Sequence, residues 1–237
     1  MTEIKLKAKE ERRLQAGHWW VFSNEIDGLD TTIEPGTLVR VMSQEGKQVG
    51  IGFFNPHSLI AVRLLMKGAG ELPENFVFEN IDNAYTYRKE IGVRKYGRMC
   101  YGESDHMPGL VIDRYGDVLV IDVLTAGMEK LKPEITQAVQ KIFKPKGIYY
   151  KNDSSFRALE GLGSTPEIIG EVPEAVEIEE NKVKIKNLAK EGRHVIFDFE
   201  YPLSTHIEKE DLEVMILNKF LMRRIGYDTV TAFRIAL

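Results

Sequence analysis

Hydrophobic and polar residues alternate along several short segments in the first 70 positions, a period of two that is typical of half-buried β-strands. Turn residues such as Pro35-Gly36 and Glu45-Gly46 separate these segments. We therefore expect strands over 4–7, 19–22, 38–42, 48–54 and 59–65, and a short helix over 9–16. Short strands at this spacing predict a small β-barrel.

The pattern changes after a glycine-rich linker over 67–73. Apolar residues recur at helical spacing after Phe76 and again after Pro133, which suits the first turn of a helix. Between them, Gly116-Asp117 fits a two-residue hairpin loop between strands 110–115 and 118–124. A further strand over 148–151 and a helix from 153 to 159 complete a compact α+β unit.

The last segment is less regular. Strands are expected over 183–185 and 194–199, and apolar residues have helical spacing over 208–225. The expected division is a barrel over 1–70, an α+β middle domain over 74–180, and a third segment over 181–237.

Composition limits the class of protein. The chain has 237 residues, of which 43% are hydrophobic and 29% charged, as in ordinary globular proteins. Its single cysteine, Cys100, excludes an internal disulfide and a cysteine metal cluster. The first residues are charged and no apolar run of about 18 residues occurs, so we expect neither a signal peptide nor a membrane anchor. The expected location is cytoplasmic.

Charge is unevenly distributed around a net value of -4. Every charged residue between 160 and 180 is acidic, whereas cations outnumber anions in the first 20 positions. Any RNA-binding surface is therefore expected on the N-terminal side, with the acidic stretch forming a linker that faces away from it.

Cations and flat rings near the N-terminus are the residue types that bind RNA, because cations neutralise phosphates and rings stack on unpaired bases. A solvated helix face beside a buried tryptophan is the simpler interpretation. Lys151 and Arg157 flank a strand-to-helix junction and could hold a phosphate; the alternative is a surface Arg157–Glu160 pair. The candidate RNA-binding residues are Lys5, Lys7, Arg12, Arg13, His18, Trp20, Lys151 and Arg157, with Trp19 beside them.

Other polar groups are weaker candidates. Glu103, Asp105 and His106 could form an acid/base or metal group, but a loop-capping role for Asp105 and Ser104 through hydrogen bonds is favoured. Asn55 and His57 could meet a ligand, although such a segment more often only turns the chain. A nucleophilic cysteine needs a lowered pKa, so Cys100 is better explained as a small buried hydrophobe. No G-x-G-x-x-G or Walker sequence occurs.

Four blocks together resemble one family. They are 13–22 with 24–26; 35–64, which includes GIGFFNPHS; GESDHMPGLVIDRYGD over 102–117 with 125–129; and YKNDSS over 150–155 with Arg157 and 159–162. Over about residues 1–190, the chain resembles the bacterial rRNA large subunit methyltransferase I family. Blocks of this length are far more specific than a three-residue motif.

The resemblance implies a PUA domain, a middle α+β domain and a C-terminal Rossmann-like methyltransferase domain. It also implies an S-adenosylmethionine-dependent synthesis of 5-methylcytosine in 23S rRNA, in which a cysteine thiolate adds to the base. The family segment expected near Glu191 is not recognisable, and neither a glycine-rich cofactor turn nor catalytic cysteines follow. Cys100 does not occupy their place. We therefore expect at most a remnant of the Rossmann-like domain, with no catalytic residue and no bound cofactor.

Three hypotheses follow. The chain is a truncated or diverged family member that supplies RNA binding, with 23S rRNA as its partner. Alternatively, it is a stand-alone RNA-binding module. A third possibility is a protein-interaction module that forms a homodimer through the apolar face of segment 208–225.

Overall fold

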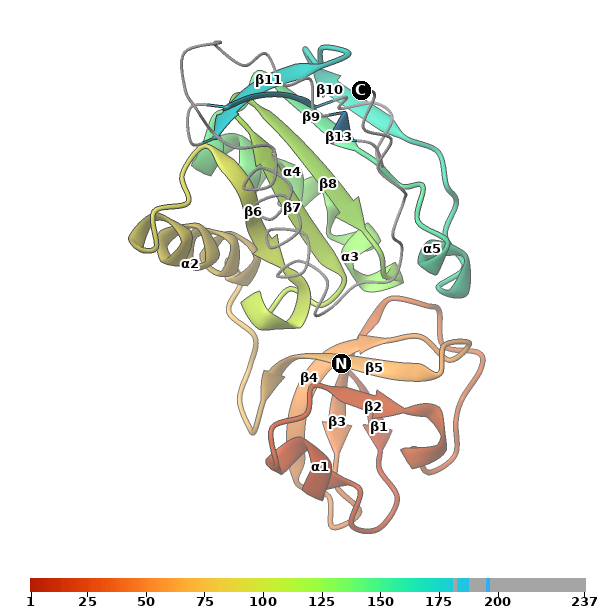
Figure 1. Cartoon of the computed structure of the whole chain (residues 1–237). Coiled ribbons are helices and arrows are strands. Elements are labelled where there is room, and N and C mark those ends of the chain that lie inside the picture. Colours follow the sequence, from red (N-terminus) through yellow and green to blue (C-terminus); the bar gives the residue numbers. More distant parts are fainter. Residues whose placement is uncertain (181–182, 188–194, 197–237) are drawn as a thin grey trace, which may run out of the picture. The chain divides into compact units, whose positions relative to one another are not determined.

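The computed structural model describes residues 1–180, 183–187 and 195–196, all within one compact unit, Met1–Asp198. A small barrel forms its N-terminal part (Figure 1). The barrel strands are β1 (Thr2–Lys5), β2 (Trp20–Phe22), β3 (Thr37–Met42), β4 (Gln48–Phe54) and β5 (Ile60–Lys67); its helices are α1 (Glu11–Gln15) and the 3-10 turn η1 (Ser23–Glu25).

The barrel sheet has the order β1-β3-β4-β5-β2. Only β1 and β3 are parallel; the other neighbours are antiparallel. Alternate strand residues such as Val39 and Val41 point inward and are fully buried, as the period of two predicted. The first strand was expected over 4–7, but it covers Thr2–Lys5. Beyond it, Leu6 forms only an isolated bridge to Ile26.

An α+β domain follows the barrel. Its strands are β6 (Tyr96–Tyr101), β7 (Leu110–Tyr115), β8 (Val118–Val123), β9 (Gly147–Tyr150) and β10 (Glu167–Gly170). Its helices are α2 (Phe76–Glu90), η2 (Gly102–Asp105), α3 (Ala126–Lys130), α4 (Lys132–Phe143) and α5 (Phe156–Leu159). The sheet order is β10-β9-β8-β7-β6, and β8 and β9 are parallel, with α3 and α4 in the crossover between them.

Two hydrophobic cores form, one in each domain. The barrel core is built from residues between Ile4 and Leu64. In the second core, α2 and α4 bury residues such as Ile81 and Val139 against Ile112 and Ile121 of the sheet. The predicted hairpin is present between β7 and β8, where Gly116 has a φ of 64° that suits glycine at the first loop position.

Strands β6 and β10 were not expected. In β6, Met99 and Cys100 are both buried because the register shifts between Arg98 and Cys100, and this bulge removes the alternation that marks a strand. The acidic stretch after Glu160 was expected to be a linker. This is wrong, because β10 pairs with β9 through Glu167 and Tyr150, and Val176–Glu180 forms a further strand.

A third, antiparallel sheet has the order β11-β12-β13. Its strands are β11 (Val176–Glu180), β12 (Val183–Asn187) and β13 (Val195–Ile196), close to two of the segments expected to be extended. The helix expected over 208–225 lies outside the described residues. Within the part of the chain that is described, no helix is long and apolar enough to cross a membrane.

Candidate functional site

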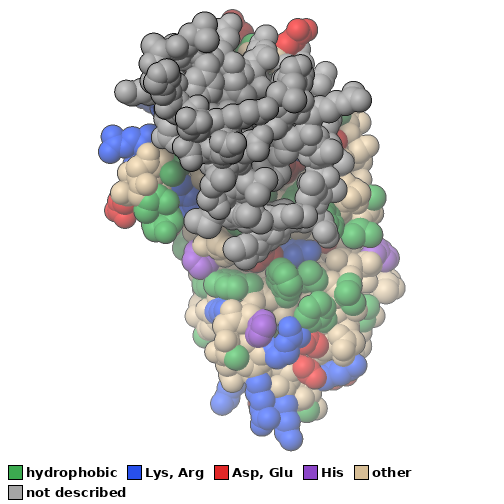
Figure 2. Space-filling model, in the orientation of Figure 1, with side chains coloured by type: hydrophobic (Ala, Val, Ile, Leu, Met, Phe, Trp, Pro, Cys, Tyr) green, Lys and Arg blue, Asp and Glu red, His purple; other side chains and the backbone are tan. Residues whose placement is uncertain are grey.

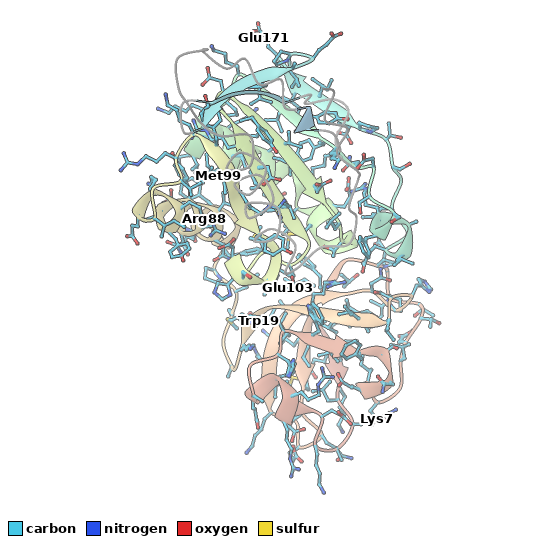
Figure 3. The ribbon with its side chains drawn as sticks, viewed as in Figure 1. Lys7, Trp19, Arg88, Met99, Glu103 and Glu171 are labelled. Carbon is cyan, nitrogen blue, oxygen red and sulfur yellow. The ribbon has the colours of Figure 1, made fainter. Side chains whose placement is uncertain are left out.

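Several cations of the N-terminal segment lie on the surface of the barrel. Lys5, Lys7 and Arg12 are exposed. Lys7 donates a 2.8 Å hydrogen bond to the backbone oxygen of Asn24, which leaves the rest of its ammonium group open to solvent. Figure 2 shows Lys and Arg side chains gathered on the barrel at the bottom of the view, and Figure 3 places Lys7 on this part of the molecule.

Arg13 has a structural partner. Its guanidinium forms an ion pair with Glu25, whose side chain is only 8% exposed, and lies 4.9 Å from the centre of the Phe22 ring. Glu25 also accepts a 2.8 Å hydrogen bond from the Phe22 backbone N–H. Arg13 therefore neutralises a buried carboxylate and holds the entry to η1 in place.

The two tryptophans contact the loop around η2; Figure 3 labels Trp19 and Glu103 there. The Trp19 ring is 4.9 Å from the His106 ring at an interplanar angle of 62°, and Lys67 Nζ lies 4.1 Å from the centre of the Trp19 ring. The Trp20 indole N–H donates a 2.6 Å hydrogen bond to Glu103. The contacts with His106 and Glu103 join residues more than 80 positions apart, so the local sequence pattern carried no sign of them.

The loop around η2 is held by hydrogen bonds. Asp105 accepts two bonds from the Arg88 guanidinium, at 2.5 and 2.7 Å, and one of 2.6 Å from the Tyr101 N–H. The capping role expected of Asp105 is confirmed. Glu103, Asp105 and His106 each contact different partners, and the described residues contain no group of three side chains that could hold a metal ion.

Glu160 connects the middle domain to the barrel. This side chain, in a residue only 7% exposed, accepts hydrogen bonds from Asn55 Nδ2 at 2.8 Å and Ser58 Oγ at 3.1 Å. Arg63 lies 3.8 Å from it and also pairs with Glu103 at 3.2 Å. Beside this network lies a cavity of about 10 Å³, which is too small for any ligand larger than a water molecule.

Arg157 is buried, so the surface role predicted for it is wrong. It is 4% exposed, donates a 2.6 Å hydrogen bond to the Gly163 oxygen, and pairs with Glu129 at 3.0 Å. It also donates to the Val123 oxygen. The expected Arg157–Glu160 surface pair is not formed either, because Glu160 faces the barrel.

Lys151 lies apart from these contacts, at the end of β9. Its ammonium group is 3.7 Å from Asp153, and its side chain is 17% exposed. Burial raises the pKa of the neighbouring Asp122, and Lys151 opposes that increase. The phosphate grip that the sequence predicted for Lys151 and Arg157 together is not assembled, since the two side chains have different partners and α5 has only four residues.

A cofactor bound to a parallel sheet usually lies beyond the carboxyl ends of its strands. Here the turn after β8 meets the barrel instead. A Cβ atom on Gly127 would lie 2.1 Å from the Phe53 ring, and one on Gly36 would lie 2.6 Å from the Ala126 oxygen. Phe53 and the backbone of Gly36 fill the space beyond the end of this strand.

Cys100 faces the core of the middle domain and is fully buried. Burial raises the pKa of its thiol far above the ordinary value, and Asp105 adds to the increase. The thiol is therefore protonated at neutral pH, whereas a nucleophile must be a thiolate. The expectation that Cys100 is a small buried hydrophobe is confirmed.

Comparisons with known proteins agree with this architecture. Residues 4–67 match the model of a PUA-like domain. The chain is 33% identical over 202 residues to ribosomal RNA large subunit methyltransferase I of Pseudoalteromonas atlantica, covering 83% of this chain and 51% of that protein. The protein of the same name from Vibrio cholerae is 35% identical over 188 residues, covering 77% and 47%. The chain thus spans about half the length of the curated relatives it matches.

Solved structures share the fold. A protein from Streptococcus mutans described as a SAM-dependent methyltransferase superimposes with a TM-score of 0.65 at 18% identity, covering 79% of this chain and 50% of that one. A methyltransferase complexed with SAH gives the same TM-score and identity, covering 78% and 47%. At this identity, the likeness establishes the arrangement of the domains' elements and no more.

Proposed function

We propose that the described part of this chain binds RNA for an S-adenosylmethionine-dependent rRNA methyltransferase, because about four fifths of the chain is similar to ribosomal RNA large subunit methyltransferase I at 33% identity. The target class we propose is 23S rRNA, in the cytoplasm. The proposal concerns the barrel and the middle domain, which are the parts whose structure supports it.

One observation carries the proposal: a PUA-like barrel exposes Lys5, Lys7 and Arg12, none of which neutralises a buried acid. Arg13 and Arg157 differ, because both are paired with carboxylates inside the fold. Exposed cations bind phosphates and thereby release the counterions around the nucleic acid. This electrostatic contribution to affinity does not require a net positive charge on the whole protein. A chain with a net charge of -4 can therefore bind RNA through one local surface.

We also propose that the described residues do not perform the methyl transfer. The only thiol of the chain is buried and protonated, and the turn after β8 is filled by Phe53. The proposal predicts that titration of this chain with S-adenosylmethionine in a calorimeter gives no binding heat. Saturable binding would refute this part and leave the proposal on RNA intact.

RNA binding is tested by measuring the affinity of the chain for overlapping fragments of 23S rRNA at several salt concentrations. The triple variant Lys5→Ala/Lys7→Ala/Arg12→Ala removes three exposed cations of the barrel. Three lost phosphate contacts should weaken binding by about tenfold or more at low salt and reduce the salt slope by about 2.

The matched control is Arg94→Ala/Lys95→Ala/Lys141→Ala, which removes three exposed cations of the middle domain and changes the net charge equally. The proposal requires a much smaller loss of affinity in this control. Equal losses would mean that net charge, and not the barrel surface, governs binding; absence of binding by the unaltered chain would refute the proposal outright.

A stand-alone RNA-binding module would give the same result in this experiment, and it differs only in lacking a role in methylation. The dimerisation hypothesis depends on segment 208–225, which lies outside the described residues. No observation on the described residues favours it.

A further inference from the structure

We propose that His106 of the middle domain is an RNA-binding residue, which together with Trp19 of the barrel forms a two-domain stacking site for an unpaired base. This inference rests on the proposed RNA-binding function and adds a site and a ligand class to it. Its starting observation is the contact of the Trp19 and His106 rings across the junction, 4.9 Å apart and inclined at 62° (Figure 3 labels Trp19).

The two rings differ in exposure. His106 is exposed, whereas Trp19 is half-buried and has Lys67 lying over its ring at 4.1 Å. At an angle of 62°, the rings do not stack face to face, and a single neighbouring ring can cover at most one face of the imidazole. Because His106 is exposed, it presents ring surface to solvent while its contact with Trp19 holds it.

The backbone of His106 is fixed before any ligand arrives. Its φ of 57° lies in the left-handed region, its oxygen accepts a 3.2 Å hydrogen bond from Asn80, and its N–H donates to the Glu103 oxygen. The preceding Asp105 is held by Arg88. A ring that is already ordered loses little conformational freedom on binding, which favours affinity.

The charges around the rings suit a ligand that carries phosphates. Asp105 is paired with Arg88, whereas Glu103 accepts the Trp20 N–H and shares the Arg63 guanidinium with Glu160, so the negative charge beside His106 is largely offset by these two arginines. Lys67 lies next to Trp19, and the exposed His18 and Trp20 continue the surface on the barrel side. Cations beside rings are the combination that binds a stacked base and its flanking phosphate.

The ligand class that fits is single-stranded RNA. In a duplex, bases are stacked on each other and their faces are not available to a side chain, whereas unpaired bases in loops can stack on protein rings. We therefore expect the site to prefer an unpaired segment of rRNA over the same sequence held in a duplex.

The experiment uses the complete chain and a short single-stranded oligonucleotide from 23S rRNA, with the same sequence in a duplex for comparison. The chain has two tryptophans, both at the junction, so a stacking base should quench the intrinsic fluorescence. The variant is His106→Asn, because asparagine tolerates the left-handed backbone but lacks the aromatic ring. The control is His57→Asn, another exposed histidine, on the β4–β5 connection of the barrel.

We expect His106→Asn to weaken binding of the single strand by about tenfold, a typical loss for one stacked base, while His57→Asn binds as the unaltered chain does. Thermal unfolding of each variant shows whether the fold is kept, and His106→Gly replaces His106→Asn if it is not. If the unaltered chain binds RNA and His106→Asn binds equally well, this inference is wrong and the proposed function stands. If the unaltered chain binds no RNA, the proposed function fails first.

Discussion

Glu160, which follows α5, and Asn55, at the end of β4, are 105 positions apart, and their side chains form a hydrogen bond of 2.8 Å. The same carboxylate accepts the Ser58 hydroxyl and lies 3.8 Å from Arg63. A buried carboxylate that serves several barrel residues at once couples the two domains, because its removal leaves the Asn55 amide and the Ser58 hydroxyl without this acceptor.

Replacing Glu160 by alanine should therefore destabilise the protein by about 1–3 kcal/mol, the cost of leaving the buried Asn55 amide without its partner, while Arg63 keeps its ion pair with Glu103. Urea unfolding measures the change in the free energy of unfolding. Glu174→Ala, at an exposed glutamate, is the control and should change stability by less than about 0.5 kcal/mol. Similar values for the two variants would show that the network does not hold the domains together.

The contact between Gly127 and Phe53 predicts a steric effect. A Cβ atom at Gly127 would lie 2.1 Å from the ring of Phe53, so Gly127→Ala should lower the free energy of unfolding by about 1–3 kcal/mol through overpacking. Gly163→Ala introduces the same atom where nothing lies within 4 Å and should be nearly neutral. Adding Phe53→Leu to Gly127→Ala should recover part of the loss; no recovery would place the strain elsewhere.

Cys100 should resist alkylation in the folded protein. Burial and the nearby Asp105 raise the pKa of its thiol, so the reactive thiolate is not populated at pH 8. Iodoacetamide labelling followed by mass spectrometry is expected to show an unmodified native chain, with rapid modification after guanidinium unfolding. Equal labelling rates in the two states would contradict the buried position of this residue.

Asp122 should make stability depend on pH. Burial raises its pKa above the ordinary 3.8, Lys151 and Arg98 oppose this, and Asp153 and Asp113 reinforce it. A raised carboxyl pKa means that the fold prefers the protonated form. Its stabilising contribution is therefore complete below pH 3.8 and is lost as the pH rises through the folded-state pKa.

The variant Asp122→Asn should accordingly gain stability relative to the unaltered chain between pH 4 and pH 7, as measured by urea midpoints at both values. The exposed Asp27→Asn serves as the control and should leave the difference between the two midpoints unchanged. If the stability advantage of Asp122→Asn over the unaltered chain became smaller between pH 4 and pH 7, the pKa of Asp122 would be lowered by folding, and this prediction would be wrong.

Much of the local structure could be predicted because its causes are local. The hairpin from Leu110 to Val123 follows from alternation and from a glycine that accepts positive φ at Gly116. Helix α4 begins beside Pro133 and has an apolar stripe at helical spacing, so its buried side was also foreseeable. Strand β6 was missed because its bulge destroys the alternation on which such a prediction depends.

Some features of the candidate site could likewise be predicted from the sequence, whereas others depend on folding. The concentration of cations and rings near the N-terminus could be found without a structure, and so could the resemblance to a methyltransferase family, since composition and long motifs do not depend on folding. Which of these groups face solvent depends on the tertiary fold. Arg12 stays exposed, Arg13 neutralises Glu25, and Arg157 is buried beside Glu129. An ion pair between distant residues leaves no period or spacing in the chain, because only folding brings the two charges into contact. For the same reason, the meeting of Trp19 with His106 could not be found before the domains were in place.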